Sequence, residues 1–82
     1  MYDERKVDDV VLALLHLNAF KDRFGWRAWK GLDWDALDRL HARGLIGDPR
    51  SKAKSVVLTD EGAAMAEDLF NHHFGSPSDD RT

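Results

Sequence analysis

The sequence of 82 residues contains no cysteine, only two prolines and no long hydrophobic run. Without cysteine the chain has no disulfide, no thiol nucleophile and no cysteine-based zinc site. The longest apolar run extends from Val10 to Leu15, far short of the roughly 20 residues that a membrane-spanning helix requires. The N-terminal stretch from Met1 to Lys6 also lacks the basic and apolar order of a signal peptide. We therefore expect a cytoplasmic protein that does not associate with a membrane.

The composition is that of a small globular domain. Hydrophobic residues make up 43% of the chain and charged residues 33%, which is ordinary for a folded protein and unlike a disordered one. A chain of this length buries only about 60–65% of its unfolded surface, near the lower limit for one core. We expect a single domain over residues 1–74. Residues 75–82, rich in Ser, Gly and Asp, have nothing to bury and should form a disordered tail.

Three amphipathic helices are predicted from the spacing of apolar residues and from capping residues. The first runs from about Glu4 to about Phe20 after the N-cap Asp3. The second follows the N-cap Asp33 and ends at Gly44, and the third begins at Thr59. Their apolar faces are Val7, Val10, Val11, Leu14 and Leu15 in the first helix, Trp34, Leu37, Leu40 and His41 in the second, and Ala66, Leu69, Phe70, His73 and Phe74 in the third.

The segments between these helices are less regular. Lys21 to Leu32 shows no apolar period, so it is compatible with one short helix or a tight loop. Asp48 and Pro49 mark a turn, and the segment from Val56 to Leu58 is typical of a strand. A hairpin is therefore expected between Ile46 and Thr59. The predicted fold class is α+β, mainly α with a small two-stranded β-hairpin, in a winged-helix-like arrangement.

Positive charge is concentrated in the middle of the chain, although the net charge is −3. Arg50, Lys52 and Lys54 alternate with small residues, so an extended hairpin would place all three on one face, where they could contact phosphates. Arg39 and Arg43 on the second helix complete the candidate nucleic-acid-binding set. A solvated loop explains the three hairpin cations nearly as well.

Three tryptophans, Trp26, Trp29 and Trp34, lie close together and are interleaved with Arg27 and Lys30. Aromatic and basic residues in this pattern can stack on nucleic-acid bases or form the centre of a protein interface. They can also fill the core of a small domain, since aromatic side chains contribute much of the burial in such cores. The sequence leaves these three interpretations open.

No arrangement of residues indicates catalysis or a metal. Asp33, Asp35 and Asp38 are explained as an N-cap, a first-turn acid and a solvated charge. His72 and His73 are adjacent on a helix, so their side chains diverge by about 100° and cannot share a metal on their own. His16 and His41 lie on separate helices. We expect no enzymatic activity, no metal site and no cofactor.

Two blocks of sequence resemble a family of short bacterial proteins of unknown function, and the resemblance extends from about Val7 to about Phe74. The first block is Trp29-Lys30-Gly31-Leu32-Asp33-Trp34-Asp35 with Leu37, Arg39-Leu40-His41 and Gly44-Leu45-Ile46. The second is Asp48-Pro49 and Lys52-Ala53-Lys54-Ser55-Val56 with Leu58-Thr59 and Glu61-Gly62. The stretch from Gly44 to Gly62 also resembles the wing region of winged-helix regulators of the MarR and PadR type. That resemblance implies DNA binding by the helix before the wing.

Two functional hypotheses follow. The first is a DNA-associated transcriptional regulator that contacts the phosphates of duplex DNA. The second is a protein-interaction module without nucleic-acid binding or catalysis, because Asp35 and Asp38 would face phosphates unfavourably while the tryptophans suit an interface. In either case Leu12 and Leu17 widen the apolar surface of the first helix, and Phe70 and Phe74 near the C-terminus can complete an apolar seam between two copies. A two-fold homodimer is therefore expected.

Overall fold

The computed structural model of the protein describes residues 1–76. Within them lie three helices and a small three-stranded sheet, which confirms the α+β class. Of the tail predicted over residues 75–82, the part from 77 to 82 lies outside the described residues. The elements in chain order are α1 (Glu4–Leu17), β1 (Ala19–Asp22), β2 (Gly25–Trp29), α2 (Trp34–Ala42), β3 (Ser55–Val57) and α3 (Asp60–Phe74).

All three helices begin at the predicted N-caps, which confirms those predictions. The side chains of Asp3, Asp33 and Thr59 accept hydrogen bonds from backbone N–H groups in the first turn of their helices. Gly44 terminates helix α2 as predicted, since it follows the C-cap residue Arg43 and its φ of 77° lies in the left-handed region. The N–H of Gly44 donates to the carbonyl of His41, and the next N–H donates to that of Leu40. This pair of bonds is a Schellman motif, which satisfies carbonyls at the helix end.

A β-hairpin joins α1 to α2, so the prediction of a short helix or a loop between Lys21 and Leu32 was wrong. Helix α1 also ends at Leu17 rather than Phe20, because β1 begins two residues later. Strands β1 and β2 pair in antiparallel register, with Asp22 opposite Gly25. The turn is closed by Asp22, whose carboxylate accepts the N–H of Phe24 at 2.8 Å, and by Gly25 at a φ of 133°.

Of the hairpin predicted between Ile46 and Thr59, only the pairing at its two ends is present. Ile46 and Leu58 form an isolated antiparallel bridge, and the N–H of Gly47 donates to the carbonyl of Val57 at 2.8 Å. Strand β3 pairs mainly with β2, which gives an antiparallel sheet in the order β1-β2-β3. Residues 48–54 form a loop. In a helix-turn-helix, a first helix directly precedes the recognition helix. In residues 1–76 the β1–β2 hairpin directly precedes α2 instead.

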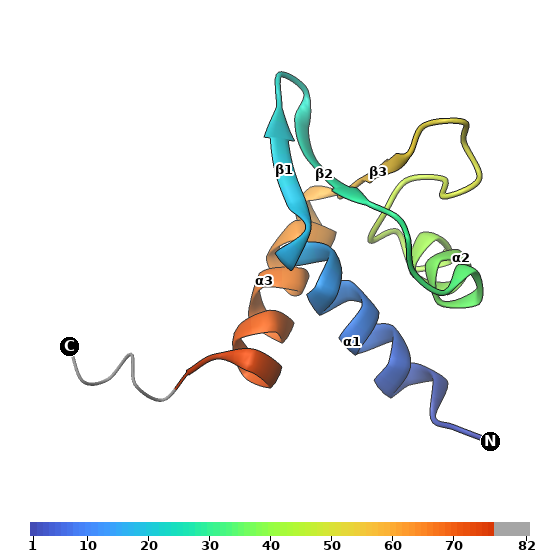
Figure 1. Ribbon diagram of the computed structural model, residues 1–82, viewed down its shortest axis with the longest axis vertical. Coiled ribbons are helices and arrows are strands. Elements are labelled where there is room, and N and C mark those ends of the chain that lie inside the picture. Colours follow the sequence, from blue (N-terminus) through green and yellow to red (C-terminus); the bar gives the residue numbers. More distant parts are fainter. Residues whose placement is uncertain (77–82) are drawn as a thin grey trace.

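The core lies where α1 packs against α3, α2 and the sheet, and the hairpin projects beyond the helices (Figure 1). Leu12 and Leu15 of α1 are fully buried within the chain, so much of the apolar width of this helix is covered without a partner. Leu17 and Phe74 are exposed, and the homodimer stays a prediction. No helix among residues 1–76 is long and apolar enough to cross a bilayer. The buried hydrophobic residues are Val11, Leu12, Ala13, Leu15, Ala28, Ala36, Leu37, Leu40, Leu45, Ile46, Val56, Leu58 and Ala66.

A tight junction fixes the start of α3 against the end of α2. The hydroxyl of Thr59 donates to the carbonyls of Gly44 (2.8 Å) and Leu45 (3.1 Å). The same oxygen accepts the N–H of Gly62 at 3.0 Å. A Cβ on Gly62 would lie 1.8 Å from the carbonyl oxygen of Leu45. The helix can approach this closely only because residue 62 has no side chain.

Candidate interaction surface

All eight aromatic residues lie outside the core of the described chain, which is built from aliphatic side chains and alanine. The three tryptophans are exposed, at 43% for Trp26, 54% for Trp29 and 46% for Trp34. Phe24, at the tip of the hairpin, is 88% exposed. The structure therefore contradicts the interpretation that the tryptophans fill the core.

The hairpin carries an indole on each of its faces. Side chains alternate along β2, so Trp26 lies on the face of buried Ala28, whereas Trp29 lies on the outer face with Arg27. On the outer face the Trp29 ring packs on Phe20 of β1, with ring centroids 4.8 Å apart. Arg27 is held there by hydrogen bonds to the Ser55 hydroxyl (2.8 Å) and carbonyl (3.0 Å). Two separate aromatic surfaces result.

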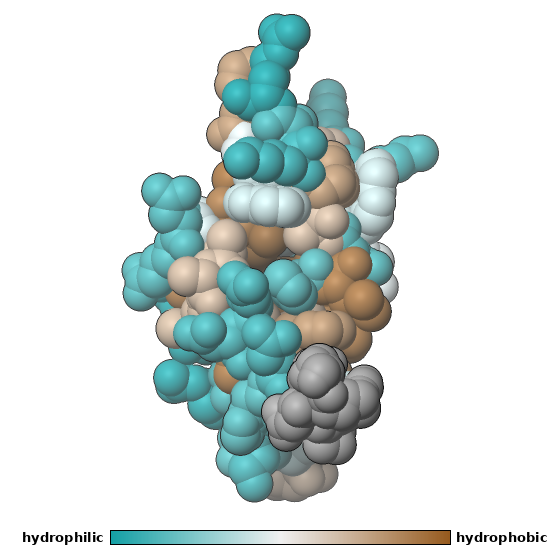
Figure 2. All heavy atoms as spheres, turned by 90° about the vertical axis from the view of Figure 1, so that its left-hand side faces the viewer, coloured by the Kyte–Doolittle hydropathy of each residue, from teal (hydrophilic) through white to brown (hydrophobic). Residues whose placement is uncertain are grey.

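Figure 2 shows the side of the molecule that carries β1 and α3. Hydrophobic residues form patches there below the tip of the hairpin, and hydrophilic residues lie among these patches and dominate the lower part (Figure 2). Apolar surface set among polar residues is common at protein interfaces.

Trp34 lies at the start of α2 and anchors the loop of residues 48–54. The Nζ of Lys30 and the guanidinium carbon of Arg50 lie 5.6 and 5.4 Å from the centroid of its ring. Lys30 also donates hydrogen bonds to the carbonyls of Pro49 (2.7 Å) and Ser51 (2.8 Å). These cation–π and hydrogen-bond contacts hold the loop beside the indole, so part of the Trp34 surface is used within the chain.

Arg50 forms a two-pronged ion pair with Asp38, at 3.2 Å from Nε and 2.6 Å from Nη2. The hydrogen bonds from Arg50 hold the pKa of the Asp38 carboxyl below its usual value. They raise the pKa of Arg50 in return. Asp38 is solvent-exposed as the sequence suggested, at 40% of its side chain, but it is paired, and its partner is a residue of the candidate nucleic-acid-binding set.

Arg39 is also engaged inside the fold. Its Nε donates to both carboxylate oxygens of Asp8 (3.0 and 2.8 Å), and its Nη2 donates to Oδ1 at 2.8 Å. Glu4 lies 3.4 Å from Nη1. The hydrogen bonds to Asp8 raise the pKa of the guanidinium. Asp8 is only 3% exposed, so its carboxylate is held almost entirely out of contact with water.

The other three candidate cations differ in their surroundings. Arg43 directs Nη2 toward the sulfur of Met65 at 3.9 Å, and its Nη1 is buried with no hydrogen-bond partner among residues 1–76. Lys52 and Lys54 are exposed in the loop, and neither ammonium group has an ionic or hydrogen-bond partner in the described chain. The five residues therefore do not form one free cationic surface.

The histidines lie apart from one another, except for the adjacent pair on α3. The His16 ring contacts Phe70 of α3 at a centroid distance of 5.2 Å, and His41 Nδ1 lies 3.1 Å from the carbonyl oxygen of Ile46. Within residues 1–76 no group of three or more potential ligands from His, Cys, Asp and Glu could hold a metal ion.

The structure adds Phe20, Phe24 and Lys30 to the residues of interest. Phe20 supports Trp29, Phe24 occupies the hairpin tip, and Lys30 joins Trp34 to the loop. A signal for the first two was present in the sequence. Asp22 and Gly25 bracket Arg23 and Phe24, an order compatible with a two-residue hairpin turn whose last flanking residue is a glycine.

The fold and its surface define a small α+β domain with an aliphatic core and an aromatic exterior. The family model described as "Domain of unknown function (DUF6429)" matches residues 3–76, and the chain belongs to that family. A protein of Sinorhizobium fredii (strain NBRC 101917 / NGR234), named uncharacterized protein y4hR, is 57% identical over 72 residues. This match covers 88% of the present chain and 93% of the relative. No solved structure matches the chain.

Proposed function

We propose that the protein is a cytoplasmic protein-interaction module without catalytic activity, and that its aromatic exterior binds a protein partner. One observation carries the proposal, namely the exposure of Trp26, Trp29 and Phe24 on a projecting hairpin, together with that of Trp34 at the start of α2. Burying a large apolar side chain stabilises a fold by about 1.5–3 kcal/mol. A small domain that leaves its largest side chains in water forgoes that stabilisation, and exposed apolar surface of this kind usually marks a binding site.

The chemistry of the surface agrees with this proposal. Tryptophan and arginine are the residues most often found at the energetic centre of protein interfaces. Trp29 is already packed on one side by Phe20 and flanked by the fixed side chain of Arg27. Less conformational entropy is therefore lost when a partner covers it. A second copy of the chain, as in the predicted homodimer, is one candidate partner among proteins.

Replacing Trp29 with alanine should weaken binding of the native protein partner by roughly 30-fold or more, the usual cost of truncating a central interface residue. The melting temperature should change little because the indole contributes no core burial. The measurement is an affinity pull-down from nuclease-treated native extract, with isolated partners then titrated. The matched control is the double variant K52A/K54A, which should retain every partner. Loss of partners only in the lysine variant would contradict the proposal.

Association with duplex DNA, as a transcriptional regulator would require, is a second candidate that rests on Lys52 and Lys54. Their ammonium groups have no partner in the described chain and lie on an exposed loop. Arg39 and Arg50, by contrast, would each have to leave a carboxylate before contacting a phosphate.

If DNA binds, log K should fall against log salt concentration with a slope of about −1.8, as expected for two phosphate contacts. A slope near −4.5, as expected for five contacts, would show that the paired arginines are released. A mobility-shift titration at several salt concentrations measures the slope. The K52A/K54A variant should abolish the shift, and no shift for the unaltered chain at tens of micromolar, near the weak non-specific limit, would reject DNA association.

A further inference from the structure

A groove of about 410 Å³ lies below the hairpin, between the end of α1, the base of the hairpin and the first turns of α3. Its volume is within the range of sites that hold small ligands or single side chains. Seven residues from these elements and from the chain just before α3 line it, namely His16, Ala19, Trp26, Leu58, Ala63, Ala64 and Glu67.

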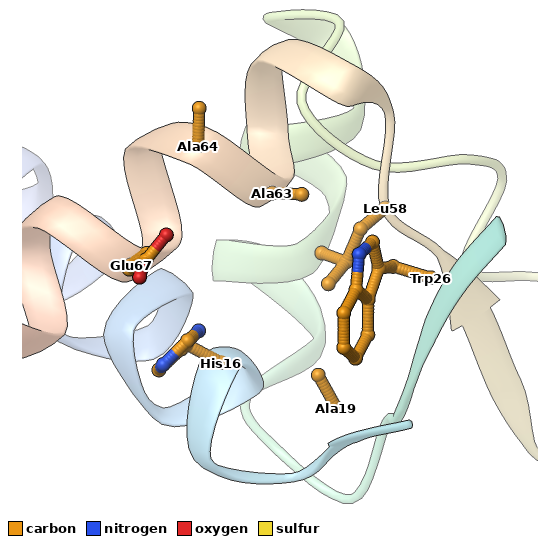
Figure 3. Close-up of a pocket in the computed structure, with 7 residues that line it drawn as sticks. All are labelled: His16, Ala19, Trp26, Leu58, Ala63, Ala64 and Glu67. Atoms are coloured by element: carbon orange, nitrogen blue, oxygen red, sulfur yellow. The ribbon is translucent and has the colours of Figure 1, made fainter. Parts of the chain in front are cut away.

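The groove has an apolar end and a polar end. Figure 3 shows the Trp26 indole standing beside Leu58, with Ala19 and Ala63 nearby, at one end. At the other end the side chains of Glu67 and His16 lie across from each other (Figure 3). Because the alanines have short side chains, the apolar end is open enough to receive an aliphatic side chain from outside.

The charges around the groove select a cation at its polar end. Helix α3 carries Asp60, Glu61, Glu67 and Asp68 and has no lysine or arginine in its sequence. Lys21 does not line the groove, but its Nζ lies 5.9 Å from the centroid of the Trp26 ring, which does. A cationic group of a bound ligand is therefore disfavoured at the indole end, near Lys21, and favoured beside the Glu67 carboxylate.

The spacing of the two ends defines the occupant. Ala63 and Glu67 are one turn apart on α3, about 6 Å along its axis. In an extended peptide, residues i and i+2 point to the same side and lie about 6.6 Å apart. The spacing of Ala63 and Glu67 along α3 therefore nearly equals the spacing of alternate side chains in an extended peptide, so two such side chains can reach the two ends of the groove.

We propose that the groove binds an extended segment of a protein partner in which a leucine-like side chain and a lysine or arginine are two residues apart. The aliphatic side chain packs against Trp26 and Leu58, and the cation pairs with Glu67. This inference rests on the proposed function, since it names the chemistry of the partner.

A blocked pentapeptide, acetyl-Gly-Leu-Ser-Lys-Gly-amide, tests the groove directly on the full chain. We expect binding with a Kd of a few millimolar, a range accessible to chemical-shift titration. The amide resonances of Ala19, Ala63 and Ala64 and the Trp26 indole N–H should move. The same peptide with Glu in place of Lys should bind roughly fivefold more weakly, because one exposed ion pair is worth at most about that factor. A peptide with Ser in place of Leu should not move the groove resonances.

Two charge-neutralising variants on α3 form a matched pair. Glu67→Gln should remove the preference for the Lys peptide, whereas Asp68→Asn, one residue away and outside the groove, should leave it unchanged. Equal binding of the Lys and Glu peptides, or no groove shift with the Lys peptide at about 20 mM, several times the expected Kd, would overturn the inference. In that case loss of the native partner in the Trp29→Ala variant would still support the proposed function. The opposite result is also informative. If the Lys peptide binds the groove while the Trp29→Ala variant keeps its native partners, the groove proposal is supported and the outer aromatic surface is rejected as the binding site.

Discussion

Replacing Gly62 with alanine should destabilise the domain by about 3 kcal/mol, the upper part of the range for overpacking. The added Cβ would lie 1.8 Å from the carbonyl oxygen of Leu45. That oxygen belongs to the backbone and accepts hydrogen bonds from Thr59, so it cannot move without breaking the junction. For a domain of this size the melting temperature should fall by about 12 °C or more. Thermal unfolding followed by circular dichroism measures the change.

Helix propensity alone gives the opposite sign for this substitution. Alanine in place of a helical glycine stabilises a helix by about 1 kcal/mol when nothing else changes. A Gly62→Ala variant that is as stable as the unaltered chain would therefore show that the junction is not tight. Gly31→Ala is the matched control because a Cβ there meets no atom within 4 Å, and its stability should stay within about 0.5 kcal/mol.

Replacing Arg39 with methionine should also lower the melting temperature strongly, by about 10 °C or more. The substitution removes both donor groups that hold the Asp8 carboxylate. Asp8 is nearly inaccessible to water, so its charge would be left buried and unpaired, which is strongly unfavourable. Thermal unfolding at neutral pH measures the effect. The same variant should not change DNA binding if that binding uses only Lys52 and Lys54.

Two further variants separate the buried charge from lost packing. Removing both charges together, as in D8L/R39M, should recover much of the stability because an apolar pair can replace a buried ion pair of similar volume. Arg5→Ala serves as the control, since Arg5 pairs with Asp9 at 3.8 Å on the surface of the same helix. Its loss should change stability little. If the double variant is no more stable than R39M, the stability lost in R39M results from lost packing and not from the buried charge.

The helices could be predicted from the sequence because their signals are local. Asp3, Asp33 and Thr59 cap the turns that directly follow them, and Gly44 ends α2 through its own backbone conformation. Each of these features depends on residues within one or two turns. The end of α1 was predicted too late, because Phe20 belongs to a strand that begins at Ala19.

The β1–β2 hairpin was not predicted from the sequence, and the reason is connected with the proposed function. A half-buried strand alternates apolar and polar residues, but in β2 an indole lies on each face, with Trp26 inward and Trp29 outward. The alternation that would identify the strand is therefore masked. The residues that hide the strand from a sequence-based prediction are the same ones that make it a candidate binding surface.

Which of the candidate cations form ion pairs could not be predicted, because ion pairing is set by tertiary structure. The pair of Arg39 and Asp8 joins residues from α2 and α1, and the pair of Arg50 and Asp38 joins the loop to α2. On local spacing alone, the neighbour of Arg39 on the same helix face is Asp35, at i, i+4. Free and engaged cations look identical in a sequence, and only the fold separates Lys52 and Lys54 from the arginines.

An aliphatic core with an aromatic exterior has a consequence for the optical properties of the protein. Each of the three tryptophans is about half exposed in the native state, between 43% and 54%, so their fluorescence emission should already lie toward the long wavelengths typical of solvated tryptophan. Unfolding would then shift that emission very little. A partner that covers Trp26 or Trp29 should shift it to shorter wavelengths, so the intrinsic fluorescence of this domain reports on binding rather than on folding.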